Sequence, residues 1–326
     1  MRFDGFVGNH GVKKQLAAEI DAGRFPHALL IEGGPGTGRR TLARLIARAA
    51  LCRHEDAAAH PCGTCAACQK ETPPDLTELG GDGTAIPVDT IRWLREDCYL
   101  LPNESAYRVM ILADAHLMRH EAQNALLKIL EEPPAHVLFI LTCDSRNGVL
   151  QTIQSRCVCL TLAPTTWEEA EPILRQRLPR ADAEELRRAH DLFGGAIGQV
   201  IDGVSEGTFR QVLELTPQMA QAIIAPTEVE LMRLTAPLEK EKPLTIGVLT
   251  GLALVFRDAL VLKYGGTATL STAPQVARQL ADRLTGPRLT ALLGVVEGLQ
   301  NDLNRNMNNT LLLTRLSACL RQAAGF

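Results

Sequence analysis

The sequence predicts an α/β domain with a wound parallel sheet, followed by a helical second half. Short apolar runs alternate with amphipathic segments up to about residue 160, and a glycine-rich loop joins an apolar run to a helix-like one. From residue 206 onward the pattern is helical throughout. A chain of 326 residues is long enough for two or three domains. We expect them at 1–163, 164–205 and 206–326.

Apolar runs in the first half predict strands at His27–Ile31, Arg108–Ala113 and Val137–Thr142. Amphipathic periodicity predicts helices at Val12–Ala22, Thr41–Ala50, Val88–Cys98 and Ala122–Leu130. The last helix should stop at Glu131-Glu132-Pro133-Pro134, because proline lacks an N–H donor and clashes with the preceding turn.

Residues 164–204 predict a small helical unit that contains the turn Phe193-Gly194-Gly195-Ala196-Ile197-Gly198. Pro217 is expected to kink the first helix that follows. The helices predicted after this unit are Phe209–Ala222, Thr227–Ala236, Leu244–Leu262, Pro274–Leu284, Arg288–Leu303 and Thr310–Ala323.

Charge and hydropathy predict a soluble, cytoplasmic protein. The net charge is -3, from 34 basic and 37 acidic residues, so any DNA contact must come from a local patch. The start of the chain lacks the apolar stretch of a signal peptide. The longest apolar stretch, Ile246–Leu262, is shorter than a membrane span and carries Arg257 and Asp258.

Residues 33–41 read Gly-Gly-Pro-Gly-Thr-Gly-Arg-Arg-Thr, between a predicted strand and a predicted helix. Glycine-rich backbone N–H groups at a helix N-terminus favour a phosphate, so this segment predicts a phosphate-binding loop. Its candidate nucleotide-contacting residues are Gly33, Gly36, Gly38, Arg39, Arg40 and Thr41.

The two residues after Gly38 depart from the phosphate-loop consensus, which has lysine followed by serine or threonine. Arg39 could still contact a phosphate, but Arg40 offers no oxygen to a magnesium ion. Thr41 cannot replace it, because one residue along a helix is a rotation of about 100°. We therefore predict that ATP is not bound productively.

The segment Arg108–His116 is typical of the strand that carries the acids of an ATPase. Two adjacent acids are normal at its end, but this chain has Ala113 followed by Asp114. Neighbours on a strand point to opposite faces, so Asp114 cannot do the work of the missing acid. A functional role for Asp114 and a capping role both stay open. Together the two departures predict a protein that does not hydrolyse ATP.

Four cysteines, Cys52, Cys62, Cys65 and Cys68, follow the spacing C-x9-C-x2-C-x2-C. Four thiolates so close in sequence can hold a tetrahedral zinc ion, and four protein ligands leave no position for a substrate. We predict a structural zinc module at 52–68. Disulfide pairing is the alternative, and His54 or His60 could each replace one ligand.

Arg40, Arg44 and Arg48 recur every four residues and predict a basic stripe on one helix face. A solvated face and a contact with DNA phosphates or an acidic partner are both open. Arg146 stands alone in the sequence, and we assign it no role.

Three further motifs resemble the clamp-loader family of bacterial DNA polymerase III, which consists of AAA+ proteins. The segment 124–134, Asn-Ala-Leu-Leu-Lys-Ile-Leu-Glu-Glu-Pro-Pro, is similar to the helix that follows the acidic strand in that family. The run Phe139–Asp144 resembles its sensor 1 strand, and Gln154-Ser155-Arg156-Cys157 matches its Ser-Arg-Cys motif. The likeness covers about 160 residues, and it implies an AAA+ domain, a helical lid and a helical collar.

Motor subunits of this family (gamma or tau) keep the phosphate-loop Lys-Thr and the Asp-Glu pair, whereas this chain resembles the subunits that lack them. Gln199 stands near the place of a sensor 2 arginine. The resemblance implies that Arg156, with Ser155 and Cys157, reaches the ATP of a neighbouring subunit as an arginine finger. An ordinary interface salt bridge is the alternative reading of Arg156.

The implied partners are gamma/tau and delta in a hetero-pentamer that acts on a sliding clamp and primed DNA, with no membrane partner. Two rival functions remain. One is a divergent active ATPase that uses Arg39 and Asp114. The other is a zinc-containing DNA-binding adaptor.

Overall fold

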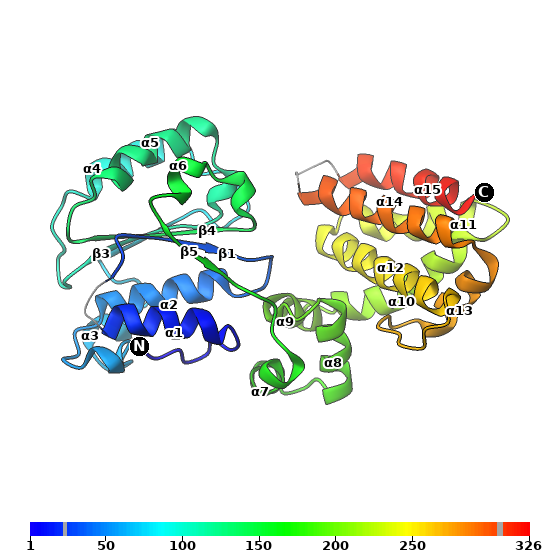
Figure 1. Ribbon diagram of the computed structural model, residues 1–326, viewed down its shortest axis with the longest axis horizontal. Coiled ribbons are helices and arrows are strands. Elements are labelled where there is room, and N and C mark those ends of the chain that lie inside the picture. The colour runs from blue at the N-terminus through cyan, green and yellow to red at the C-terminus, as the bar shows by residue number, and fades with distance from the viewer. Residues whose placement is uncertain (22–24, 305–308) are drawn as a thin grey trace. The chain divides into compact units, whose positions relative to one another are not determined.

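The computed structural model describes residues 1–21, 25–304 and 309–326 (Figure 1). The chain forms two compact units, Met1–Ile173 and Leu174–Phe326, and α7 (Trp167–Arg177) spans the boundary. The finer division of the chain into three domains stays a prediction. Ala22, the predicted end of the first helix, lies outside the described residues.

The first unit is built on a parallel five-stranded sheet in the order β2-β3-β4-β1-β5. The fold-class prediction is therefore confirmed. The strands are β1 (Ala28–Glu32), β2 (Leu76–Leu79), β3 (Arg108–Leu112), β4 (Val137–Cys143) and β5 (Val158–Thr161). The three strands predicted from apolar runs are the three central ones.

The strands β2 and β5 are both edge strands of the sheet, and the sequence did not predict them. Each has four residues, and all four residues of β2 are only partly buried. An edge strand pairs with only one neighbouring strand and keeps polar residues. Its sequence therefore lacks the continuous apolar run that predicts a central strand. Three central strands, in contrast, are buried along nearly their whole length.

Helices cover both faces of the sheet, as Figure 1 shows. On one face α1 (His10–Asp21) and α2 (Arg39–Leu51) pack on alternate strand residues such as Leu29, Val109 and Ile140. On the other face α4 (Val88–Asp97) and α5 (His120–Glu131) pack on the residues between them, such as Leu30 and Phe139. Burial of side chains on both faces explains why the strands read as continuous apolar runs.

Short segments complete the first unit. The prolines after Glu131 end α5 where the sequence predicts. The other elements are η1 (Ala57–Ala59), α3 (Ala66–Gln69), η2 (Ala115–Leu117), η3 (Arg146–Gly148) and α6 (Gln151–Gln154).

Asp75 is fully buried just before β2 and stabilises the loop that enters β3. Its carboxylate accepts the backbone N–H groups of Asn103, Glu104 and Ser105 at 2.5, 2.9 and 2.9 Å. Burial alone would raise the pKa of Asp75, but these donors outweigh it and hold the pKa below its usual value. The ionised carboxylate therefore stabilises the fold.

We expect Asp75→Asn to lower the free energy of unfolding by about 3 kcal/mol at pH 7, because backbone donors lose a charged acceptor. The folded-state pKa is depressed, so the contribution is present above the unfolded value of about 3.9 and is lost as the pH falls through the lower folded value. Urea unfolding at pH 7 and pH 3 checks this. The exposed Asp89→Asn on α4 is the control, and an equal effect of both variants would contradict the prediction.

The second unit is helical throughout its described residues, as predicted. The helix α12 (Lys242–Lys263) packs against α10 (Thr208–Ile223), α13 (Pro274–Arg283) and α14 (Gly286–Asn304). Pro217 lies inside α10, and the kink expected there stays a prediction. The helices after α7 are α8 (Ala183–Leu192), α9 (Ile197–Ser205), α10 (Thr208–Ile223), α11 (Val229–Thr235), η4 (Ala236–Glu239), α12 (Lys242–Lys263), α13 (Pro274–Arg283), α14 (Gly286–Asn304) and α15 (Asn309–Ala324).

By length and composition α12 is able to cross a membrane, which corrects the sequence-based expectation that this apolar stretch is too short. The structure gives the helix another role. It is mostly buried inside the second unit, and Asp258 on it is fully buried. The Asp258 carboxylate accepts the backbone N–H groups of Leu270 and Ser271 at 2.9 and 2.6 Å and pairs with Arg257. This burial is typical of the core helix of a soluble protein.

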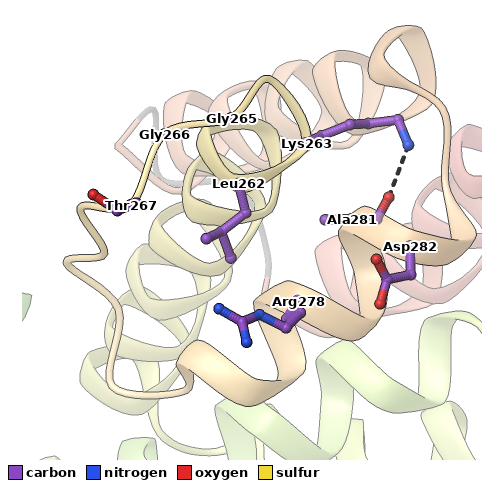
Figure 2. A pocket seen from close by; sticks show the side chains of 8 residues that line it. All are labelled: Leu262, Lys263, Gly265, Gly266, Thr267, Arg278, Ala281 and Asp282. Carbon is purple, nitrogen blue, oxygen red and sulfur yellow. Dashed lines mark hydrogen bonds between the residues drawn. The ribbon is translucent and has the colours of Figure 1, made fainter.

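A hollow of about 490 Å³ opens beside the C-terminal end of α12 (Figure 2). The Lys263 ammonium is already used, since it donates to the Ala281 carbonyl at 2.8 Å. Arg278 and Asp282 bring opposite charges to the same rim, and the C-terminal carbonyls of a helix disfavour anions. The charges therefore point to no ligand class. The lining residues are Leu262, Lys263, Gly265, Gly266, Thr267, Arg278, Ala281 and Asp282.

Candidate functional site

The predicted phosphate loop lies between the carboxyl end of β1 and the start of α2, as the sequence indicates. Gly36 and Gly38 have φ angles of 75° and 92°, which favour glycine because a side chain would be strained there. The Thr37 backbone N–H and hydroxyl both donate to the Gly34 carbonyl, at 3.3 and 2.7 Å. The loop therefore has the tight glycine turns of a phosphate loop.

Arg39 is paired with acids of its own chain at the carboxyl edge of the sheet. Its side chain is only 12% exposed; Nη1 donates to Asp144, and Nη2 lies 3.7 Å from Asp114 Oδ1. Asp114 has a left-handed backbone with φ 54° and donates its N–H to the Thr142 hydroxyl at 3.1 Å. His116 Nε2 lies 3.5 Å from the other oxygen of Asp144. Arg39, the candidate phosphate ligand, and Asp114, the candidate acid, thus lie in one cluster of opposite charges.

We expect Arg39→Ala to lower the free energy of unfolding by about 2 kcal/mol, because the part-buried carboxylates of Asp114 and Asp144 would face each other without a cation. Urea unfolding of the isolated chain measures the change. Arg48→Ala, at an exposed position of the same helix, is the matched control. A loss no larger than that of the control would show that the pair contributes nothing to stability.

The basic stripe on α2 is partly neutralised by Glu78 on β2. Arg40 Nη2 lies 2.9 Å from Glu78 Oε1, and Arg44 Nε lies 2.8 Å from Glu78 Oε2. Burial opposes the charge of Glu78, but hydrogen bonds from Arg44 and Arg40 lower its pKa below the usual value. Arg40 also donates to the Gly81 carbonyl at 2.7 Å. A contact of the stripe with DNA phosphates stays a prediction, with Arg44 and Arg48 as its exposed members.

Arg146 has a partner that the sequence analysis missed. Its backbone N–H and Nε donate to the two carboxylate oxygens of Glu32, at 3.0 and 2.8 Å. The Thr161 hydroxyl donates to the same carboxylate at 3.2 Å. Arg146 and Glu32 are 114 positions apart, so no local pattern links them; their shared signal is that both follow predicted strands.

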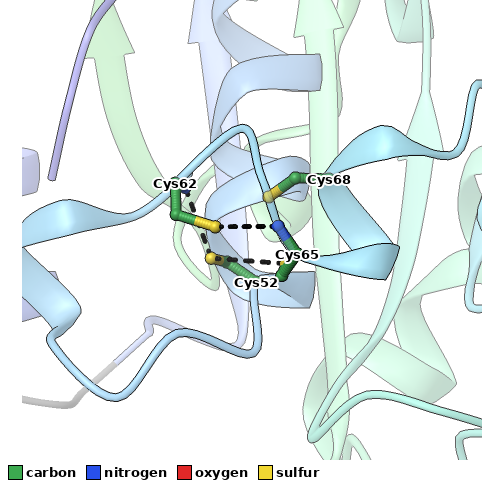
Figure 3. Close-up of side chains that lie close together, drawn as sticks. All are labelled: Cys52, Cys62, Cys65 and Cys68. Carbon is green, nitrogen blue, oxygen red and sulfur yellow. Dashed lines mark hydrogen bonds between the residues drawn. The ribbon is translucent and has the colours of Figure 1, made fainter.

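The four predicted cysteines lie together, and Figure 3 shows their sulfur atoms converging from α2, the following loop and α3. All four sulfur atoms lie within 4.8 Å of one another, and Cys52 and Cys65 are 4.0 Å apart. The cysteines form no disulfide, so the disulfide alternative is wrong for this structure. The group can hold a metal ion.

The donor set of this four-cysteine cluster fits a tetrahedral zinc ion. Zinc–sulfur bonds of about 2.3 Å place thiolate sulfurs about 3.8 Å apart. Backbone N–H groups of Cys62 and Cys65 donate to Cys52 and Cys62 sulfurs at 3.4 and 3.3 Å, as expected for a site that holds thiolates. The two histidines that could replace a ligand are used elsewhere. His54 Nδ1 accepts the Asp56 N–H, and His60 Nε2 lies 2.8 Å from the His54 carbonyl.

The thiols of this cluster differ in pKa because their surroundings differ. Hydrogen bonds from Thr64 lower the pKa of Cys62 to about 5, whereas burial raises the pKa of Cys68 to about 12. A buried thiol of this kind loses its proton when it binds a cation. One of the donors that favour the Cys62 thiolate is the Thr64 hydroxyl, which lies 3.5 Å from the Cys62 sulfur.

Arg156 follows the short helix α6, and its side chain is one-third exposed. Nη2 lies 2.7 Å from Glu131 Oε1, and Nη1 donates to the Thr152 carbonyl at 2.8 Å. Ser155 is exposed, with its hydroxyl 3.4 Å from Nη1. The Cys157 side chain packs against the hydrophobic core of the first unit, and this burial raises the pKa of its thiol to about 12.

The comparisons with known proteins decide the family. A family model described as "DNA polymerase III, delta subunit" matches residues 8–166. The DNA polymerase III subunit delta' of Escherichia coli (strain K12) is 31% identical over 311 residues, and the match covers 93% of this chain and 91% of that protein. The chain belongs to the clamp-loader family of DNA polymerase III subunits. The family predicted from the motifs is thus confirmed.

Other relatives of this clamp-loader family member match a shorter part. The DNA polymerase III subunit gamma/tau of Mycobacterium tuberculosis (strain ATCC 25618 / H37Rv) is 39% identical over 155 residues, which cover 46% of this chain. The match spans about a quarter of that relative's length, 26%. Among solved structures, the Thermotoga maritima gamma subunit-related protein is 16% identical with a TM-score of 0.45, over 97% of this chain and 100% of that one.

Gln199, the residue near the expected sensor 2 position, lies in α9 of the second unit and is half-buried. Its correspondence to the sensor 2 arginine stays a prediction, because Gln199 and the phosphate loop belong to different units.

Proposed function

We propose that this chain is a stator subunit of a DNA polymerase III clamp loader, of the delta' type, that does not hydrolyse ATP itself. In this proposal it forms a hetero-pentamer with gamma/tau and delta subunits in the cytoplasm. The assembly opens a sliding clamp and loads it on primed DNA. The chain contributes Arg156 in trans to the ATP of a neighbouring subunit.

The observation that carries this proposal is the state of the phosphate loop. Arg39 is paired with Asp144 and Asp114, and Arg40 is paired with Glu78, so both side chains after Gly38 face carboxylates of their own chain. Neither offers the oxygen that a magnesium ion needs. The loop has the conformation of a phosphate loop, but Arg39 and Arg40 are already paired with carboxylates. The hydroxyl that would bind magnesium is replaced by the Arg40 side chain.

The four-cysteine cluster supports the same assignment. We propose that it binds zinc in a structural role, because all four tetrahedral positions would be taken by protein ligands. Zinc would hold the segment 52–68 as a compact module beside α2. Cys52, Cys62, Cys65 and Cys68 are the proposed ligands.

The alternative of a divergent active ATPase needs Arg39 to contact phosphate and Asp114 to act as the acid. Both groups would first have to leave the ion pairs that they make with each other and with Asp144. Asp114→Ala separates the two functions. An active ATPase loses its turnover in this variant, whereas a stator keeps its full contribution to the assembly.

The test is ATP turnover by the purified chain, alone and mixed with gamma/tau and delta subunits. We expect no turnover above background by the chain alone. We also expect clamp loading on primed DNA only when all three kinds of subunit are present. Hydrolysis by the isolated chain that Asp114→Ala abolishes would reject the stator function, and DNA binding by the isolated chain that falls with salt would favour the adaptor.

A further inference from the structure

We propose that Glu131 is a positioning residue for Arg156, which fixes the guanidinium at the surface before a neighbouring subunit docks. This inference rests on the proposed function of Arg156 as a finger in trans. It concerns a side chain to which the sequence analysis gave no role other than the end of a helix.

The guanidinium of Arg156 lies at the ends of two helices. Glu131 is the last residue of α5, and its Oε1 lies 2.7 Å from Arg156 Nη2. Thr152 belongs to α6, and its carbonyl accepts from Nη1 at 2.8 Å. A cation is stabilised at the C-terminal end of a twelve-residue helix such as α5, where the free carbonyls carry negative partial charge. The head group is thus held from two sides by one carboxylate and one carbonyl.

This arrangement leaves donors free for a second acceptor. A guanidinium has five N–H groups. The contacts with Glu131, Thr152 and Ser155 use at most three of them, all on Nη1 and Nη2. Among the residues that the structure describes, the Nε–H and a second N–H of Nη2 have no acceptor, and both can donate to a phosphate oxygen of a neighbour. Arg156 can therefore contact a phosphate while Glu131 still holds it, so the ion pair orients the side chain rather than withdrawing it.

Orientation matters for an arginine because its long side chain has many rotamers, whose entropy is lost when the head group is fixed. A side chain that is already fixed loses less of this entropy on meeting the phosphate. The exposed ion pair with Glu131 adds little to the stability of the fold, because solvent screens the attraction between its charges. Its effect is expected on the reaction and not on folding.

The chain offers a matched control one residue away. Glu132 is exposed, carries the same charge and forms no ion pair within the described residues 1–21, 25–304 and 309–326. A general effect of negative charge at this end of α5 would be the same for both glutamates. An orienting contact belongs to Glu131 alone.

The experiment measures ATP turnover of the assembly reconstituted with gamma/tau and delta subunits. The Arg156-dependent turnover is defined as the rate with the unchanged chain minus the rate with Arg156→Ala. We expect Glu131→Ala to lower this quantity about tenfold through kcat, since misplacement of a catalytic group by 1 Å can cost about 100-fold. KM for ATP should stay unchanged. Glu131→Gln keeps an oxygen acceptor and should recover most of the rate, while Glu132→Ala and Glu132→Gln should leave it unchanged.

Other outcomes overturn the inference in distinguishable ways. If Arg156-dependent turnover is measurable but Glu131→Ala leaves it intact, Glu131 has no positioning role and the proposed function survives. A faster Glu131→Ala assembly would show that the pair withholds Arg156, which also rejects positioning. If Arg156→Ala itself changes nothing, the proposed function fails instead. Glu131→Ser is measured in parallel, so that a folding failure of one truncated variant does not decide the result.

A double variant separates positioning from an independent structural effect. Glu131→Ala should cause no further loss of turnover once Arg156 is already alanine, because coupled residues are not additive. An additional loss of the same size in the Arg156→Ala background would mean that Glu131 acts on something else.

Discussion

Removal of the zinc that we propose for the four-cysteine cluster is expected to unfold residues 52–68 and to lower the free energy of unfolding of the first unit by about 3–5 kcal/mol. Metal binding to such a group is coupled to folding, and apparent binding free energies of structural zinc in small peptides reach about 10–16 kcal/mol. The cost is smaller in this chain because α2, which carries Leu51 next to Cys52, keeps its own core contacts with the sheet.

The substitution that tests this prediction is Cys65→Ser, which removes one thiolate from a group whose sulfur atoms lie within 4.8 Å of one another. Bound zinc, measured by atomic emission on the dialysed protein, should fall from about one per chain to near zero. Limited proteolysis should then cut between residues 52 and 68, and thermal unfolding should shift downward.

Cys319→Ser is the control, because Cys319 lies on α15 in the second unit, far along the chain from the cluster. It should keep its zinc and its unfolding temperature. A chain that is washed free of zinc by a chelator and still resists proteolysis in the segment 52–68 would contradict the structural role of the metal.

Local sequence patterns were enough to predict the strands and helices that are buried in the core. The strands β1, β3 and β4 are apolar along their length because both faces are covered, and α5 ends at Glu131 because prolines follow. The edge strands β2 and β5 lack this signal. Glu78 on β2 is polar because its carboxylate faces the arginines of α2, a tertiary fact that no four-residue pattern contains.

The same limit applies to the candidate site. The spacing of the four cysteines was enough to predict that they lie together, because all four belong to one short segment. The sequence also indicated which phosphate-loop side chains are replaced. The pairing of Arg39 with Asp144 could not be predicted, since it depends on the parallel order that places the ends of β1 and β4 side by side. Arg146 with Glu32 and Arg156 with Glu131 are long-range pairs of the same kind.

Arg156→Ala is expected to have the largest effect on function. An arginine finger contributes about 10³- to 10⁵-fold to phosphoryl transfer, because its charge stabilises the negative charge that develops on the γ-phosphate. In the reconstituted assembly we expect turnover at the ATP site that adjoins this chain to fall on the order of 10³-fold. Total ATP turnover of the assembly should fall by at least the fraction that this one site contributes. The quantity to measure is DNA-stimulated ATP turnover.

The fold and the assembly should tolerate Arg156→Ala, because the side chain is one-third exposed and its ion pair with Glu131 lies at the surface. Gel filtration with the partner subunits checks that assembly is retained. Arg146→Ala removes an arginine of the same unit that is paired with Glu32, and serves as a control for the loss of positive charge. Arg156→Lys keeps the charge without the forked donors, so it should recover only a small part of the rate.

Arg156→Ala separates the arginine-finger role from an interface salt bridge. A salt bridge would weaken the assembly in Arg156→Ala and leave the turnover of the fraction that still assembles unchanged. A finger gives the opposite result, intact assembly with slow hydrolysis, because the missing group acts on the transition state and not on binding. Full DNA-stimulated turnover by an intact Arg156→Ala assembly would therefore exclude the trans-acting role of this residue.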